Sequence, residues 1–304
     1  MAHARQSLVI GGQGFLGAAI VRNLIGKGEA VTIADKYADR VKCDALFGDG
    51  ATSVVQADIT DAQSMRDLTA GYHTVYHIAG KLGTTELDDD VMIGIQSNII
   101  GAVNVFAACV QNDVPNLFYP SKPNVWLNTY TITKFASEQF AKLYASKGPT
   151  RISSLRYFNA YGPGQAMGPV RKIIPSFAER ASKGLPIEIF GSGEQIVDMI
   201  HSEDIGRLTM NFVEAVGSAE PMDLGRGIGL TVNEIADSVN AYFGNDAGVI
   251  HLPMRRGETP DTKLVADMQP LKTLLGELQF QDWTASLHDA LGWYTKSFAQ
   301  LQAA

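Results

Sequence analysis

The fold is decided by the stretch LVIGGQGFLG, residues 8–17 of the 304-residue chain. Its apolar start, residues 8–10, predicts a buried strand, and residues 15–27 predict a helix. Between them, Gly11, Gly14 and Gly17 follow the spacing G-x-x-G-x-x-G. A turn this tight needs residues without a Cβ, so that backbone N–H groups and the helix N-terminus can face a pyrophosphate. The strand-turn-helix context predicts a dinucleotide-binding turn, and a tight turn without a ligand is the simpler alternative.

An acidic residue follows where such a turn needs one. Asp35 comes directly after the second expected strand, residues 31–34. Its carboxylate is placed to accept hydrogen bonds from the ribose hydroxyls of an adenosine, and it would repel a 2′-phosphate. The sequence therefore predicts NAD rather than NADP as the cofactor.

Strands and helices alternate through the first half of the chain. The expected strands are residues 8–10, 31–34, 54–57, 74–78, 116–119 and 152–156, and the expected helices are 15–27, 61–70, 91–111 and 130–146. This rhythm predicts an α/β fold with a Rossmann-type doubly wound parallel sheet that is covered on both faces.

The rhythm breaks beyond about residue 159, where glycine–proline loops begin. We expect shorter and irregular elements there, including a helix that Thr231 and Glu234 start with a capping box. The predicted organisation is a NAD-binding Rossmann domain over residues 1–158, to which the chain returns around 196–228, and a smaller C-terminal α/β substrate domain over 159–304.

Composition narrows the classes of protein. The net charge of −7 argues against nucleic acid as a partner, because phosphate binding depends on counterions released around Lys and Arg. Two cysteines, Cys43 and Cys109, cannot build a disulfide framework and are expected to be buried or half-buried thiols. No signal-like start and no window near the roughly 20 apolar residues of a membrane span are visible, so we expect a cytoplasmic protein without membrane contact.

A second motif lies on the helix expected from residue 130. Tyr130 and Lys134 are one helical turn apart, so the phenol and the ammonium share a helix face. A nearby cation stabilises phenolate and lowers the pKa of a tyrosine toward the range of acid/base catalysis. The plainer alternative is a packed tyrosine next to a surface lysine.

Together these motifs resemble the extended short-chain dehydrogenase/reductases, and in particular the NAD-dependent epimerase/dehydratase family that acts on nucleotide sugars. The resemblance extends over nearly the whole chain. It rests on Asn98 and on residues 11–17, 35, 58–61, 75–80, 130–134, 155–164, 189–193, 198–204 and 255–258.

The resemblance implies a cofactor site at the strand ends. Asp58 and Ile59 would flank the adenine, and the small residues Ala79 and Gly80 would let the cofactor approach closely. The implied NAD-binding residues are Gly11, Gly14, Phe15, Leu16, Gly17, Asp35, Lys36, Asp58, Ile59, Ala79, Gly80, Asn98, Tyr130, Lys134 and Tyr157.

The resemblance also implies the catalytic and substrate residues. Tyr130 would be the acid/base at the sugar, Lys134 would hold the nicotinamide ribose, and Arg255 would clamp the diphosphate. The implied substrate-binding residues are Lys81, Thr84, Asn159, Arg171, Phe190 and Arg255. No metal site is expected, because the acidic run at residues 88–90 is typical of a solvated loop.

The chain departs from the family in three places. Only three residues separate Trp126 from Tyr130, so a loop that is usually present in the epimerases is missing. Lys122 stands where the family carries a catalytic Ser or Thr, and Ser121 lies one residue earlier. Either Lys122 takes a chemical role, or the neighbouring prolines turn it to solvent and Ser121 supplies the hydroxyl. An arginine of the late strand is replaced by Val197, so one diphosphate contact is lost unless Arg171 or Lys172 supplies it.

The function that the resemblance implies is a NAD-dependent UDP-sugar 4-epimerase. A dehydratase or a decarboxylase of the same family is the alternative, although residues 122–124 lack the Thr-Asp-Glu run of 4,6-dehydratases. A non-catalytic dinucleotide-binding regulator is a further class, against which the retained Tyr130 and Lys134 argue.

Assembly is the last expectation. The helices expected at residues 91–111 and 130–146 carry apolar residues on more than one side, among them Phe135, Phe140, Leu143 and Tyr144. A helix that is apolar beyond one stripe needs a second partner. In the resembling family these two helices pair across a two-fold axis, which predicts a homodimer.

Overall fold

The computed structural model describes residues 5–215, 218–256 and 258–303. Its main sheet has seven parallel strands in the order β10-β6-β5-β4-β1-β2-β3. The strands are β1 (Gln6–Ile10), β2 (Ala30–Asp35), β3 (Ser53–Gln56), β4 (Thr74–His77), β5 (Asn116–Ser121), β6 (Arg151–Tyr157) and β10 (Met222–Leu224). The predicted Rossmann-type parallel sheet is confirmed, because the first six strands fall where the sequence placed them.

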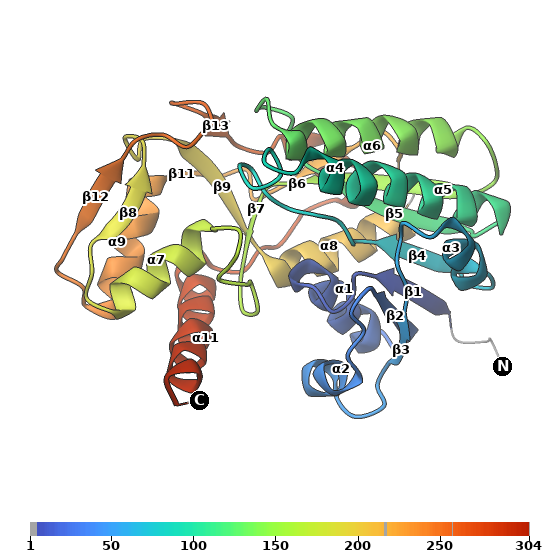
Figure 1. Cartoon of the computed structure of the whole chain (residues 1–304), viewed down its shortest axis with the longest axis horizontal. Coiled ribbons are helices and arrows are strands. Elements are labelled where there is room, and N and C mark those ends of the chain that lie inside the picture. Colours follow the sequence, from blue (N-terminus) through green and yellow to red (C-terminus); the bar gives the residue numbers. More distant parts are fainter. Residues whose placement is uncertain (1–4, 216–217, 257, 304) are drawn as a thin grey trace.

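Helices cover both faces of this sheet (Figure 1). One layer holds α3 (Ala62–Thr69), α4 (Val91–Gly94), η1 (Ile95–Ile100), α5 (Gly101–Gln111) and α6 (Thr129–Ala145). The other holds α1 (Phe15–Gly26) and α8 (Ser202–Ala215), with α2 (Arg40–Phe47) beyond them. Sequence patterning missed α2, which is short and has one fully buried residue, Cys43.

The second half of the chain builds two small sheets beside the main one. Strand β9 (Ile196–His201) pairs with β7 (Asn159–Tyr161), β11 (Gly229–Thr231) and β13 (Lys263–Leu264). Strand β8 (Ile187–Phe190) pairs with β12 (Val249–Leu252). The helices are α7 (Ile173–Ser182), α9 (Val232–Phe243), α10 (Gln269–Leu275) and α11 (Trp283–Ala303). The expected capping box at Thr231 and Glu234 is confirmed.

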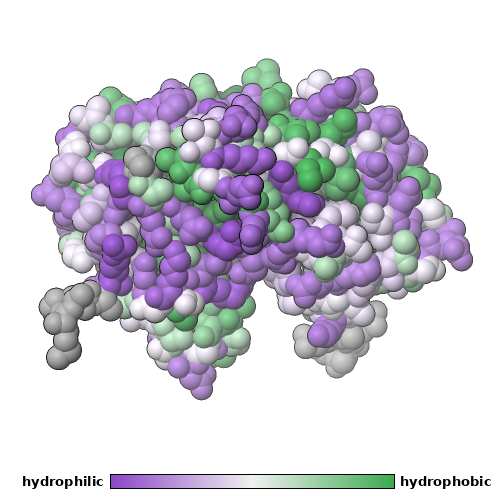
Figure 2. Space-filling model, turned by 180° about the vertical axis from the view of Figure 1, so that it is seen from behind, coloured by the Kyte–Doolittle hydropathy of each residue, from purple (hydrophilic) through white to green (hydrophobic). Residues whose placement is uncertain are grey.

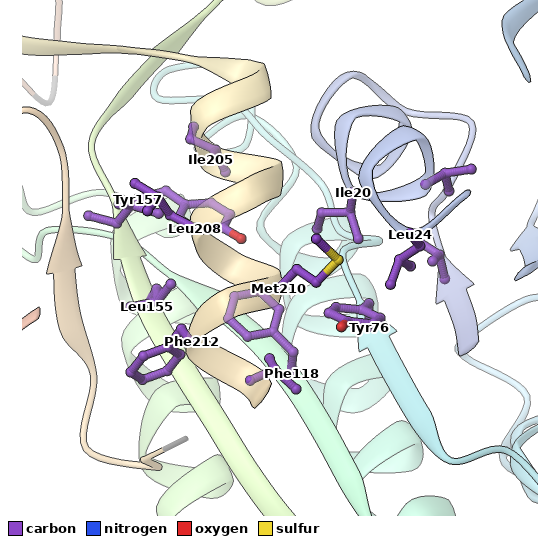
Figure 3. Packing of buried hydrophobic residues seen from close by; sticks show 14 of the residues in the cluster. Ile20, Leu24, Tyr76, Phe118, Leu155, Tyr157, Ile205, Leu208, Met210 and Phe212 are labelled. Carbon is purple, nitrogen blue, oxygen red and sulfur yellow. The ribbon is translucent and has the colours of Figure 1, made fainter. Parts of the chain in front are cut away.

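The expectation that this half holds only short elements was wrong. Helix α11 has 21 residues and α8 has 14. Helix α8 packs along α1 on the main sheet, where Ile205, Leu208 and Phe212 meet β4, β5 and β6 (Figure 3). Strand β10 then pairs with β6 at the sheet edge. Residues far apart in sequence therefore form one core, which periodicity alone does not reveal.

One helical stretch needs a second correction. Within the part of the chain that the structure describes, Val91–Gln111 is long and apolar enough to cross a membrane by length and composition, with a mean hydropathy of 1.6. No such window was expected. The stretch packs against α3 and α6 on the main sheet and buries Val105, Phe106 and Cys109 completely, so its apolar character has an explanation inside the fold.

The outer side of this helical layer keeps large apolar side chains at its surface. Exposed residues include Val91, Met92 and Ile100 on the Val91–Gln111 stretch, and Ile132, Phe135 and Leu143 on α6. On the opposite face from Figure 1 the surface is mainly hydrophilic, with hydrophobic residues gathered in its upper half (Figure 2).

Both cysteines are free and buried, as predicted.

Gly17 gives a stability test of the first turn. A Cβ on Gly17 would lie 2.1 Å from the Gly11 carbonyl oxygen, whereas a Cβ on Gly26, in the same helix, would meet nothing within 4 Å. We expect Gly17→Ala to lower the free energy of unfolding by about 1–3 kcal/mol or more. Gly26→Ala is the matched control and should leave it unchanged or raise it by up to about 1 kcal/mol. Chemical denaturation measures both, and equal effects would contradict the tight packing of this turn.

Candidate active site

One cleft of about 1110 Å³ runs along the carboxyl edge of the main sheet and continues under the second half of the chain. Every residue that the sequence assigned to cofactor, substrate or catalysis lines it. Brought together there are Gly11, Gly14, Phe15, Leu16, Gly17, Asp35, Lys36, Asp58, Ile59, Ala79, Gly80, Lys81, Thr84, Asn98, Ser121, Lys122, Tyr130, Lys134, Tyr157, Asn159, Arg171, Phe190 and Arg255. Their individual roles stay predictions.

The glycine turn forms the floor of the cleft at the end of β1. Gly11 has a φ of 86°, and a Cβ on it would lie 2.6 Å from the Ala79 backbone nitrogen. Gly14 is the N-cap of α1 and offers no side-chain cap, and the first turn of α1 carries no acidic residue. The positive end of α1 is therefore open to an anion, which suits a pyrophosphate.

Acidic residues stand at the ends of the next two strands. Asp35 accepts a hydrogen bond from the Tyr37 backbone N–H at 3.3 Å. Asp58 pairs with Lys36 at 2.9 Å and also accepts from Thr60. The Lys36 ammonium lowers the pKa of Asp58. The carboxylate of Asp58, which was expected to flank the adenine, is thus already paired with Lys36.

Asn98 ties the loop after β4 to the helical layer. It lies in η1, a π-helical segment, and is buried. Its amide exchanges hydrogen bonds with the Lys81 backbone, at 2.7 and 3.0 Å, and donates to Thr133 at 3.1 Å. A π-helical turn inside an α-helix often marks a functional site. Here it points a buried amide at the loop that carries Ala79 and Gly80.

Tyr130 and Lys134 share a face of α6, as predicted, but they do not interact as predicted. The Lys134 ammonium lies over the Tyr119 ring, 3.9 Å from its centroid. Burial and repulsion from Lys122 lower the pKa of Lys134 to about 7. Burial raises the pKa of Tyr130 to about 12. The expectation that Lys134 lowers the pKa of Tyr130 does not hold in this structure, because burial dominates the pKa of both residues.

Lys122, rather than Ser121, faces Tyr130. Its Nζ lies 5.6 Å from the centroid of the Tyr130 ring and donates to Thr131 Oγ1 at 2.9 Å. Burial lowers the pKa of Lys122 to about 8. The Ser121 hydroxyl instead donates to the Glu138 carboxylate at 2.6 Å.

Glu138 is a residue that sequence reasoning missed. Its carboxylate is fully buried behind β5 and pairs with Arg156 at 3.1 Å. The available signal was its spacing: Glu138 lies one turn beyond Lys134 on the helix face that meets the sheet. By holding Ser121, Glu138 leaves Lys122 as the polar side chain next to Tyr130.

Charged residues also gather at the far end of the cleft. The Arg255 guanidinium lies 5.2 Å from the centroid of the Phe190 ring, and it pairs with Glu258. Burial, followed by the charge of Arg255, lowers the pKa of Lys172. Arg171 instead pairs with Glu188 at 3.1 Å. Of the two cations considered as replacements at the Val197 position, Lys172 is thus the one beside Arg255.

Two expected ligand residues have other partners. The Tyr157 hydroxyl is in the core, 2.6 Å from Thr209 of α8, and the ring stacks on Phe118. Asn159 donates to the Asp198 backbone carbonyl at 3.4 Å. Tyr157 therefore contributes a wall to the cleft, and its hydroxyl does not face a cofactor.

The histidines and acidic residues near the cleft have structural surroundings. Burial lowers the pKa of His77 to about 3, so its ring is neutral between Phe106 and Tyr119. In the run 88–90, Asp88 accepts from the Thr129 backbone and Asp90 caps α4. Among the residues that the structure describes, no group of three or more His, Cys, Asp or Glu side chains could hold a metal ion.

Fold and site together define a class. A parallel sheet with an open glycine turn at the first strand, an acid at the second and a tyrosine–lysine pair on α6 is a dinucleotide-binding enzyme site of the Rossmann type. The chain belongs to the NAD dependent epimerase/dehydratase family, which it matches over residues 7–225. Members of this family are NAD-dependent enzymes that act on nucleotide sugars, as epimerases, dehydratases or decarboxylases.

Individual relatives are distant but match nearly the whole chain. The UDP-N-acetyl-alpha-D-glucosaminuronate decarboxylase of Bacillus cytotoxicus is 23% identical, over 95% of this chain and 98% of the relative. An epimerase structure from Methanothermobacter thermautotrophicus has a TM-score of 0.90 at 24% identity, covering 99% and 95% of the two chains. The UDP-glucose 4-epimerase of Thermus thermophilus, solved with NAD, has a TM-score of 0.83 at 21% identity, covering 95% and 99%. At these identities the structures show a shared fold.

The residues of this chain fit NAD. Gly11 and Gly17 pack against backbone atoms that a Cβ would strike, which keeps the turn tight, and the uncapped N-terminus of α1 opens on the same cleft. Asp35 supplies a carboxylate at the strand end where an adenosine ribose is bound in such folds.

Asp35 provides a test of cofactor choice. Asp35→Ser removes the carboxylate that favours ribose hydroxyls and repels a 2′-phosphate. We expect the preference for NAD over NADP to narrow by about 1–3 kcal/mol, the size of a lost charge-assisted hydrogen bond. Isothermal titration of both cofactors measures the gap. Asp237→Ser, an exposed carboxylate on α9, is the control and should leave the gap unchanged. Equal affinities in the unmodified protein would overturn the assignment.

Lys122 provides a test of the electrostatics. Its pKa is about 8 in the folded protein and 10.5 ordinarily, so the cost of burying its charge is fully present below about pH 8. The cost disappears as the pH rises toward 10.5, because the folded state then releases the proton first. Lys122→Met should therefore stabilise the cofactor-free protein at about pH 7, and by less at about pH 9.5.

Denaturation curves at the two pH values give this comparison. Lys183→Met is the control, since Lys183 is exposed and paired with Glu179, and its effect should not change with pH. A loss of stability in Lys122→Met at both pH values would mean that the ammonium is well solvated.

Proposed function

We propose that this protein is a NAD-dependent nucleotide-sugar epimerase of the UDP-sugar 4-epimerase type. The observation that carries the proposal is the position of Tyr130, which is half-buried on α6, has Lys122 beside its ring and lines the same cleft as Lys134 and the glycine turn. Epimerisation needs only reversible oxidation at one sugar carbon and rotation of the resulting ketone. Tyr130 is the acid/base residue that this proposal uses, and one such residue is sufficient for that chemistry.

In this proposal Tyr130 takes the proton from the sugar hydroxyl and later returns it. The bound nicotinamide supplies a reversible acceptor for the hydride of the sugar carbon. Removing the proton from Tyr130 opposes its raised pKa, and the Lys122 ammonium, 5.6 Å from the ring centroid, stabilises the phenolate that forms. Lys134 holds the nicotinamide ribose from the same helix face.

Arg255 binds the diphosphate of the substrate at the far end of the cleft. Its planar guanidinium matches phosphate oxygens and rests on the Phe190 ring. The pairing with Glu258 fixes its orientation and is available for exchange when a phosphate enters. Lys172, beside it, adds a second positive charge and compensates for the neutral Val197.

Decarboxylation is the second candidate, because a relative with this activity matches the chain over nearly its full length. We also propose that two copies pair through α6 and the Val91–Gln111 stretch. The exposed apolar residues on these helices, including Ile132, Phe135 and Leu143, support this pairing.

A substrate panel with a Tyr130 variant tests the proposal. The protein with NAD is incubated with UDP-, GDP- and dTDP-sugars and the products are read by proton NMR and mass. Epimerisation leaves the mass unchanged, dehydration removes water, and decarboxylation removes carbon dioxide. We expect an unchanged mass with a UDP-sugar, and a loss of at least about 100-fold in rate with Tyr130→Phe, in line with the usual contribution of an acid/base residue. A change of mass would move the protein to one of the other reactions, and full activity of Tyr130→Phe would place the acid/base elsewhere.

A further inference from the structure

Lys122 is an ammonium held in the cleft by neutral groups. Its Nζ donates to the Pro123 carbonyl at 2.6 Å and to Thr131 Oγ1 at 2.9 Å. Two aromatic rings complete its surroundings, with centroids 5.8 Å away for Trp126 and 5.6 Å away for Tyr130. Ring faces and carbonyl oxygens orient a cation but do not neutralise it.

Among the described residues, burial is the one influence that shifts the pKa of Lys122, and no carboxylate offsets it. Its charge acts on Lys134, a second buried cation, and lowers the pKa of that residue. Glu138 does oppose this effect at Lys134, but its oxygens are taken by Ser121 and Arg156.

The cations at the outer end of the cleft differ in this respect. Arg255 pairs with Glu258 and Arg171 with Glu188. The charges of Glu86 and Glu258 oppose the effect of burial and of Arg255 on the pKa of Lys172. Carboxylates thus act on these three cations, whereas no carboxylate of the described residues shifts the pKa of Lys122. A buried charge without a partner is costly, so a site that retains one is arranged for an anionic ligand.

We infer that Lys122 selects a sugar that carries a carboxylate, so that the substrate is a nucleoside diphosphate hexuronate. This inference rests on the proposed function, because it takes Tyr130 to act at C4. The carboxylate of a hexuronate is attached to C5, the neighbour of C4, and therefore lies next to the hydroxyl that Tyr130 serves. Lys122, beside the Tyr130 ring, is the cation within reach of that position.

A pair between the Lys122 ammonium and the substrate carboxylate explains why a hexuronate would be preferred over a neutral hexose. A neutral hexose would displace water from the Lys122 ammonium and offer it a hydroxyl, leaving the charge uncompensated. A hexuronate supplies a charge-assisted hydrogen bond at the same place and reduces the repulsion between Lys122 and Lys134. The alternative explanation is that Lys122 binds the diphosphate. In that case Lys122 would have no effect on the preference between sugars.

Calorimetric titration of the protein loaded with NAD distinguishes these explanations. The probes are UDP, UDP-glucose and UDP-glucuronate, the last two differing only at C6. We expect UDP-glucuronate to bind at least about tenfold more tightly than UDP-glucose, the range for a hydrogen bond to a charged group. Lys122→Met should remove this preference and leave the affinity for UDP unchanged, and Lys122→Arg should keep most of the preference.

Lys183→Met removes a positive charge from the outer part of the cleft and serves as the control, with the preference retained. Equal or tighter binding of UDP-glucose in the unmodified protein would overturn the inference, and so would a preference that survives Lys122→Met. A parallel loss of affinity for all three probes in Lys122→Met would assign Lys122 to the diphosphate instead. If UDP itself and both sugars fail to bind, the proposed function is wrong and the inference falls with it.

Discussion

The site depends on the close backbone approach of three strand ends around Gly11. The Gly11 N–H donates to the Ala34 carbonyl at 2.7 Å, and the Ala79 N–H donates to the Ile10 carbonyl at 2.9 Å. These bonds join the ends of β1, β2 and β4 before each strand gives way to its loop. A Cβ at Gly11 would lie 2.6 Å from the Ala79 backbone nitrogen, so only glycine fits there without displacing that backbone. The remaining functional side chains are arranged from this edge outward.

A second constraint is the charge that the site keeps in its centre. Lys122 and Lys134 lose hydration and repel each other. The Glu138 carboxylate accepts a hydrogen bond from Ser121 and pairs with Arg156. The arrangement lowers the stability of the folded protein and provides a cationic environment around Tyr130, which is a common pattern at functional sites. Lys122, which stands where the family carries a hydroxyl residue, is then the polar side chain beside Tyr130, because Ser121 is hydrogen-bonded to Glu138.

Much of the fold follows from short-range signals. The turn at residues 11–17, the alternation of strands and helices, and Asp35 each depend on a few neighbouring residues, and all of them were predictable. The long helices α8 and α11 were not, because α8 acquires its place by packing on α1 across nearly 200 residues of sequence. The partner of Tyr157 is likewise a residue of α8, which local pattern cannot show.

The candidate site divides in the same way. The residues assigned from the sequence all line the cleft, but the pairings there, such as Lys36 with Asp58 or Ser121 with Glu138, were not predicted. The choice between Lys122 and Ser121 was open because two prolines flank the decisive residue. The answer depends on the direction that each of these two side chains takes at the end of β5. The buried Glu138 carboxylate on α6 decides it by accepting the hydrogen bond of Ser121.

The most direct measurement of the central claim is the near-ultraviolet absorbance of the purified protein with NAD after mixing with a nucleotide sugar. If Tyr130 and the glycine turn serve one reacting centre, a band of reduced nicotinamide rises and decays during turnover without net consumption of cofactor. A spectrum that stays unchanged while the nucleotide sugar is bound would contradict the account and leave a dinucleotide-binding protein without this chemistry.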